Sequence, residues 1–172
     1  MRKSAQFRAD CQFVRQKTTL YNELDKIRDW LYIGDYHDAR DEETIRHHGI
    51  KAILNLVEQT RYEGIALRYL PVEDGRPLTP SQISQGKSFI KVQRLFGYPT
   101  LVSCGEGISR STTFCMAILM DVEDLTIFEA YDEVKKHHPQ AEPHAALVVS
   151  LATYHRIKLT EEDWVRYMND AD

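Results

Sequence analysis

Residues Leu101-Val-Ser-Cys-Gly-Glu-Gly-Ile-Ser-Arg-Ser-Thr-Thr113 carry the strongest local signal in the chain. An apolar run ends in Cys104, two glycines follow, and Arg110 stands six positions after the cysteine. The apolar run is typical of a buried strand, and the glycine-containing stretch is typical of a loop that leads into a helix. Cys104 is then either a buried core cysteine beside a turn or a nucleophile inside an anion-binding loop.

The second interpretation follows from the effect of each part of this loop on negative charge. Gly105 and Gly107 can adopt backbone angles that turn successive N–H groups to one side, which makes a nest for an anion. The helix expected to begin near Arg110 adds the positive end of its dipole. The planar Arg110 guanidinium can bind two oxygens of one phosphate. Because the same groups favour a thiolate at Cys104, the loop predicts a phosphate site with a nucleophilic sulfur.

Strand and helix signals alternate along the rest of the chain. Strands are expected at residues 30–34, 50–57, 65–72 and 98–103, and helices at residues 41–48, 79–97, 110–122, 126–137 and 143–157. Thr79 and Pro80 fit the N-cap and first position of one helix, and Gly49 fits the end of another. This alternation predicts an α/β domain with a largely parallel sheet. Cys104 falls at the carboxyl end of a strand, where open α/β sheets bind ligands.

Length and composition exclude several classes of protein. The 172 residues, 42% of them hydrophobic and 28% charged, suit a single domain with a sizeable core. A net charge of -4 argues against a nucleic-acid partner, and the apolar runs are too short to span a membrane. Three cysteines make no disulfide framework, and no signal-peptide core is evident, so we expect a cytoplasmic protein.

Both ends of the chain differ from the central domain, which we expect to span residues 27–157. Residues 1–26 form a basic arm that is expected to be helical, with Phe7, Cys11 and Val14 on one face. This arm either docks on the domain or binds a membrane surface or a partner. Residues 158–172 form an acidic tail, with a peripheral helix expected around Trp164.

Displacing an alkoxide or a phenoxide from phosphorus also requires a proton donor. Asp74 follows a predicted strand and precedes Gly75, so it can fold back toward the cysteine loop, and Glu73 is the competing candidate. Ser111 is either a helix-start residue that bonds locally or a hydroxyl that steadies the sulfur as a leaving group, and both roles can hold together.

The segment Val102-Ser-Cys-Gly-Glu-Gly-Ile-Ser-Arg-Ser-Thr-Thr113 resembles the V-H-C-x-x-G-x-S-R-S signature of the cysteine-based dual-specificity protein phosphatases, which belong to the protein tyrosine phosphatase superfamily. Leu31-Tyr-Ile-Gly-Asp35, Gly49-Ile-Lys-Ala-Ile-Leu-Asn-Leu56 and Met116-Ala-Ile-Leu-Met120 also resemble family segments in the right order. The resemblance implies a five-stranded, mostly parallel sheet flanked by helices, with the cysteine loop between its last strand and a helix.

The resemblance also implies a role for each residue of the loop. Cys104 would attack phosphorus and form a phosphocysteine, and Arg110 would bind the phosphoryl group. Asp74 would protonate the leaving group and then activate water, and Ser111 would assist release of phosphate. The phosphoryl oxygens would be held by backbone N–H groups of the loop, from Gly105, Glu106, Gly107, Ile108, Ser109 and Arg110.

Ser103 departs from the family pattern, and Glu106 bears on the choice of substrate. Ser103 replaces a histidine that braces the loop in relatives; a serine can donate one hydrogen bond, so a weaker brace is expected. Glu106 is either a solvated loop charge or a carboxylate that disfavours a highly anionic lipid substrate. Arg61 and Tyr62 lie in a loop that is expected to border the site, and they are possible substrate contacts.

We therefore predict a phosphatase acting on phosphotyrosine, and in addition on phosphoserine or phosphothreonine, in proteins or peptides. Phosphate is the product, and no cofactor or metal is expected. The paired histidines His47-His48 and His137-His138 lack zinc-like spacing and fall at predicted helix ends, where positive charge suits the dipole. The alternatives are a non-catalytic phosphate-binding module, a lipid or RNA 5′-phosphatase, and a rhodanese-type sulfur transferase. The joint presence of Cys104, Asp74 and Arg110 favours the protein phosphatase.

Overall fold

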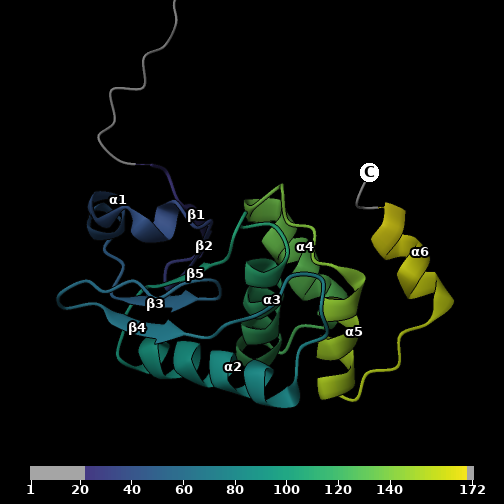
Figure 1. The fold of residues 1–172 in the computed structure, drawn as a ribbon. Coiled ribbons are helices and arrows are strands. Elements are labelled where there is room, and N and C mark those ends of the chain that lie inside the picture. The colour runs from purple at the N-terminus through teal and green to yellow at the C-terminus, as the bar shows by residue number, and fades with distance from the viewer. Residues whose placement is uncertain (1–21, 170–172) are drawn as a thin grey trace, which may run out of the picture.

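The computed structural model describes residues 22–169; residues 1–21, which make up most of the predicted arm and include Cys11, lie outside this range, as do residues 170–172. The centre of the fold is a five-stranded sheet in the order β1-β2-β5-β3-β4, with helices on its faces (Figure 1). The strands are β1 (Asp25–Arg28), β2 (Leu31–Gly34), β3 (Ala52–Asn55), β4 (Ala66–Tyr69) and β5 (Thr100–Ser103). Within this sheet, β1 pairs antiparallel with β2 and the other pairings are parallel. The prediction of a single, mostly parallel α/β domain is confirmed.

The three central strands, β2, β3 and β5, are buried along their whole length, because the sheet is covered on both faces. Successive side chains point to opposite faces. Leu54 and Val102 join the larger core, whereas Ile53 and Leu101 join the smaller one. Since β5 is the middle strand of the five, Cys104 leaves the sheet at its centre.

The helices divide unequally between the two faces of the sheet. Their bounds are η1 (Asp38–Arg40), α1 (Glu42–His47), α2 (Pro80–Leu95), α3 (Arg110–Glu123), α4 (Ile127–His137), α5 (Ala145–Tyr154) and α6 (Glu161–Asn169). Ile45 of α1 packs in the smaller core, and α2 to α5 contribute to the larger one. Helix α3 lies against α2, α4 and α5, and Phe114 and Cys115 are fully buried within it.

The helix starts follow local capping rules. Thr79 caps α2 in a capping box with Gln82, and Pro80 occupies the first turn, as predicted. Thr126 caps α4 in the same way with Glu129. Gly49, after α1, has a φ of 66°, a left-handed conformation that favours glycine. These local signals explain why most element boundaries agree with the prediction to within a few residues.

The ends of the described chain pack on the domain. Strand β1 lies where no strand was expected, and the expected arm–domain boundary at residue 26 falls inside it. Helix α6 is the helix expected around Trp164, and its Tyr167 is buried against Tyr131, with ring centroids 5.4 Å apart. None of the helices within residues 22–169 combines the length and apolarity needed to cross a bilayer.

Candidate active site

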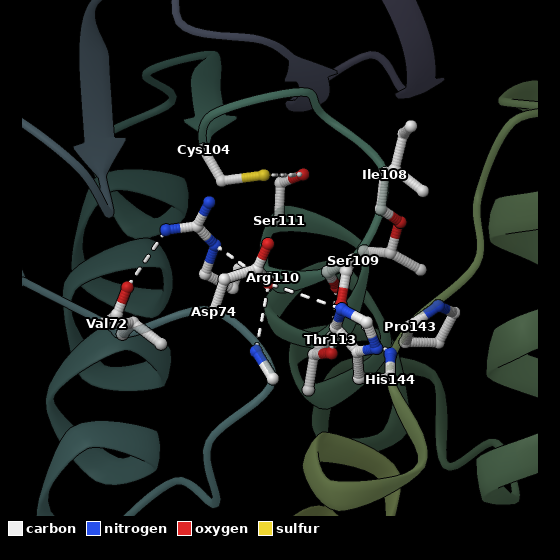
Figure 2. Close-up of polar contacts among 12 residues, drawn as sticks. Val72, Asp74, Cys104, Ile108, Ser109, Arg110, Ser111, Thr113, Pro143 and His144 are labelled. Carbon is white, nitrogen blue, oxygen red and sulfur yellow. Dashed lines mark hydrogen bonds and ion pairs between the residues drawn. The ribbon is translucent and has the colours of Figure 1, made fainter.

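Cys104 follows the middle strand β5 and begins a loop that ends at the first residue of α3. The residue is 2% exposed, and its side chain lines a cavity of about 350 Å³. The Cys104 sulfur lies 3.2 Å from the Ser111 hydroxyl oxygen in the first turn of α3 (Figure 2). Strand, loop and helix N-terminus thus bring the thiol and the hydroxyl together as predicted.

Both glycines of the loop lie at close approaches, and the backbone requires glycine at position 107. A Cβ on Gly105 would lie 2.9 Å from Nη2 of Arg110, so the absence of a side chain leaves room for the guanidinium. Gly107 has a φ of 73°, and a Cβ there would lie 3.1 to 3.3 Å from the backbone of Gly34 and Asp35. Any other residue would be strained at position 107 and would push the loop away from β2.

Arg110 is held in place by two contacts with the segment that follows β4. Its Nη1 donates to the Val72 carbonyl at 3.0 Å, and its Nε lies 3.3 Å from Oδ1 of Asp74 (Figure 2). The second contact is close enough for an ion pair but is not aligned as a hydrogen bond, because Nε has no hydrogen-bond partner among the described residues. The side chain is 13% exposed, so a bound oxyanion would meet a nearly desolvated guanidinium.

Asp74 lies at the cavity and Glu73 does not. The Asp74 carboxylate is half exposed, and its Oδ1 is also 3.7 Å from Nε2 of His144. Glu73 instead pairs with Arg76 at 3.4 Å on an exposed surface. The geometry therefore favours Asp74 as the proton donor among the two candidates.

The cavity contains most of the predicted residues and several that were not predicted. The predicted residues that line it are Asp74, Cys104, Glu106, Ile108, Ser109 and Arg110. The unpredicted ones are Glu142, Pro143, His144, Ala145 and Tyr167. All but Tyr167 come from the turn into α5, and no motif or spacing in the sequence connects this turn with the cysteine loop.

This turn is attached to the loop by hydrogen bonds. The Glu142 N–H donates to the Ile108 carbonyl at 3.0 Å, and the His144 N–H donates to the Ser109 hydroxyl at 2.9 Å. Tyr167 of α6 donates its hydroxyl proton to the Pro143 carbonyl. Burial raises the pKa of the Tyr167 hydroxyl, which keeps it protonated as a donor.

Ser103 does not brace the loop. Its hydroxyl is completely buried and has no hydrogen-bond partner among residues 22–169, so the one hydrogen bond that a serine could donate is not made, in line with the weaker brace that was expected. The neighbouring residue on β3 is Asn55, whose side-chain oxygen accepts from the N–H groups of Val57 and Glu58 instead. The loop must be supported from elsewhere.

Arg61 and Tyr62 are not brought to this cavity. The Tyr62 hydroxyl donates to the Ala39 carbonyl at 3.1 Å, and its ring packs against the smaller core. Arg61 is exposed. Contact of either residue with a substrate stays a prediction.

Comparison with known proteins agrees with this geometry. The family model "Dual specificity phosphatase, catalytic domain" matches residues 31–157. The chain belongs to the dual specificity phosphatase family. Curated members include Dual specificity protein phosphatase 22 of Homo sapiens, which is 29% identical over 153 residues, covering 84% of this chain and 81% of the relative. Dual specificity protein phosphatase 26 of Homo sapiens is 33% identical over 129 residues, 69% of this chain and 61% of the relative.

Relatives also differ in length. Dual specificity protein phosphatase 5 of Homo sapiens is 32% identical over 134 residues, which is 75% of this chain but 35% of that protein. Among solved structures, human DUSP28 has a TM-score of 0.71 at 25% identity, and the match covers 78% of this chain and 96% of the DUSP28 chain. DUSP15 has a TM-score of 0.69 at 26% identity, and the match covers 86% of this chain and 92% of the DUSP15 chain. Sequence and fold thus both place the chain in this family of protein phosphatases.

Proposed function

We propose that this dual specificity phosphatase family member hydrolyses phosphomonoesters on proteins through a phosphocysteine intermediate. The supporting observation is that the Cys104 thiol, the Arg110 guanidinium and the Asp74 carboxylate all line one cavity. A phosphate-binding module without activity would need the cation and the loop amides, but it would need neither a nucleophile nor a proton donor.

In the first step, the Cys104 thiolate attacks phosphorus while the bond from phosphorus to the substrate oxygen breaks. Asp74, starting protonated, gives its proton to that oxygen, so a neutral alcohol or phenol leaves. The loop N–H groups and Arg110 bind the phosphoryl oxygens. Because the transition state is loose, their fixed positions and charge supply most of the rate enhancement.

In the second step, water attacks the phosphocysteine and the bond between sulfur and phosphorus breaks. Asp74, now a carboxylate, takes the proton from the water. The sulfur leaves as a thiolate, and the hydroxyl of Ser111 lies 3.2 Å away, where it can donate a hydrogen bond to the developing charge. Inorganic phosphate then dissociates, and both groups return to their starting states.

The charges at the cavity favour a singly phosphorylated protein residue over a polyanionic lipid headgroup. Three carboxylates line the cavity, on Asp74, Glu106 and Glu142. Arg110 and His144 are the basic groups among the lining residues. A second phosphate near this rim would meet like charges, whereas the single phosphate of phosphotyrosine or phosphoserine would be neutralised by Arg110.

The test uses two substrates that differ in leaving group, p-nitrophenyl phosphate and a phosphotyrosine peptide. Cys104→Ser should abolish turnover of both. Asp74→Asn should slow the peptide about 10²- to 10⁴-fold and p-nitrophenyl phosphate less, because nitrophenolate leaves without help from an acid. Glu73→Gln is the matched control and should be close to wild type. Phosphopeptide binding without turnover by the wild-type protein would instead identify a binding module.

A further inference from the structure

His138, the residue that follows α4, makes two short polar contacts in a buried position. Its Nε2 lies 2.8 Å from the Gly107 carbonyl oxygen of the cysteine loop, and its Nδ1 lies 2.6 Å from Oδ2 of Asp25 in β1. The residue is 2% exposed. It was expected to be a charge at a helix end, but its ring points into the protein and connects β1 with the loop.

Both partners of His138 are hydrogen-bond acceptors, a carbonyl and a carboxylate. An imidazole ring donates from both nitrogens only in its doubly protonated, cationic form. Because a carbonyl oxygen can only accept, Nε2 is the donor in the contact with Gly107, and the Asp25 carboxyl group faces the other ring nitrogen. Gln140 adds a third contact, because its Nε2 lies 3.4 Å from the same Asp25 oxygen.

The contact with Gly107 fixes the orientation of one peptide group. In a trans peptide the carbonyl and the following N–H point in opposite directions, and the N–H that follows the Gly107 carbonyl belongs to Ile108. With the carbonyl directed to His138, the Ile108 N–H is directed to the other side of the loop. Ile108 lines the cavity beside Cys104, so this N–H is one of the donors available to an oxyanion.

We propose that His138 and Asp25 are a pair of positioning residues that hold the Gly107–Ile108 peptide in its anion-binding orientation. In this chain the pair does what Ser103, whose hydroxyl has no partner among the described residues, does not do. Neither residue would touch the substrate; both would act through the backbone of the loop. The proposal rests on the proposed function only in taking this loop as the site that receives the phosphoryl group.

The experiment measures binding of tungstate by calorimetry, which needs no turnover, and steady-state kinetics with p-nitrophenyl phosphate. The variants are His138→Leu, which removes both ring nitrogens, and Asp25→Asn, which replaces the carboxyl group by an amide. We expect tungstate affinity to fall about tenfold in His138→Leu and less in Asp25→Asn, with a matching rise in KM and a smaller change in kcat. His138→Arg, a planar cation with several donors, should recover part of the affinity.

His137→Leu is the matched control. It changes the adjacent histidine, whose Nδ1 contacts the Glu133 carbonyl within α4 at 2.9 Å, and it should leave tungstate affinity unchanged. Wild-type affinity in His138→Leu, or an equal loss in His137→Leu, would overturn the proposal. If His138→Leu does not fold, the tungstate affinity of Asp25→Asn is the test, and wild-type affinity in that variant would overturn the proposal. This variant should fold, because the Asp25 side chain is 40% exposed and tolerates an amide. If the wild-type protein binds tungstate but turns over no substrate, the positioning role is still decided while the proposed function fails.

Discussion

Removing the Ser111 hydroxyl should separate the two steps of the proposed reaction. This hydroxyl is fully buried and lies 3.2 Å from the Cys104 sulfur. In a Ser111→Ala variant, the thiolate that leaves phosphorus in the second step loses a hydrogen-bond donor. A hydrogen bond to a charged group contributes about 1.5–3 kcal/mol. Since about 1.4 kcal/mol corresponds to a tenfold change in rate, hydrolysis of the phosphocysteine should slow about 10- to 100-fold.

Rapid mixing with p-nitrophenyl phosphate measures both steps. The Ser111→Ala variant should release close to one equivalent of nitrophenol per active site in a burst, followed by slow steady-state turnover, because the intermediate accumulates. Thr113→Val is the control, since it removes a buried hydroxyl from the same helix that donates to the Ser109 carbonyl and not to sulfur. A Ser111→Ala enzyme with no burst and with kcat within about threefold of wild type would refute the assignment.

Three further predictions concern stability. A Cβ at Gly86 would lie 2.3 Å from the buried Phe114 ring, so Gly86→Ala should lower the unfolding free energy by about 1–3 kcal/mol, measured by thermal melting. Ser103→Ala removes a buried hydroxyl that has no partner among the described residues, and it should raise the urea midpoint with kcat within about twofold of wild type; a large loss of activity would restore a bracing role for Ser103. Burial, together with the charge of Lys87, lowers the pKa of His155 below its ordinary 6.5. The folded protein therefore favours neutral His155, and the stability that this contributes is complete above pH 6.5 and is lost as the pH falls through the pKa of His155 in the folded state. His155→Gln should therefore lose less stability than wild type in urea titrations between about pH 7.5 and pH 5.5.

The parts of the fold that were predicted correctly are those set by neighbouring residues. Thr79 and Pro80 specify the start of α2 through the capping box and a fixed φ, and Gly49 ends α1 because it accepts a left-handed backbone. The strand–loop–helix unit around Cys104 is equally local. Its glycines, its arginine and its helix start lie within a few residues of the sulfur, so the geometry of Cys104, Arg110 and Ser111 could be expected from the sequence.

The parts that were not predicted depend on contacts between distant segments. Strand β1 has only four residues, and three of them are charged, so its sequence does not indicate a strand. Its position is set by pairing with β2 and by the burial of Leu24 and Ile27. Tyr167 reaches the cavity because α6 folds back on α4. His138 and Asp25 are 113 positions apart, and no periodic pattern connects them. Ser103 in place of the family histidine was informative only once the structure showed that its hydroxyl has no hydrogen-bond partner within residues 22–169.

The outer edge of the cysteine loop is held by the segment between α4 and α5. Consecutive loop residues contact this segment in order: the Gly107 carbonyl with His138, the Ile108 carbonyl with the Glu142 N–H, and the Ser109 hydroxyl with the His144 N–H. Because these oxygens bond on the outer side, the intervening N–H groups remain for the cavity side. The Tyr167 hydroxyl bonds to Pro143, which couples α6 to the same segment. The local motif thus supplies the reacting groups and a distant segment supplies their orientation, so substitutions between residues 138 and 144 should change oxyanion affinity more than the chemistry of the sulfur.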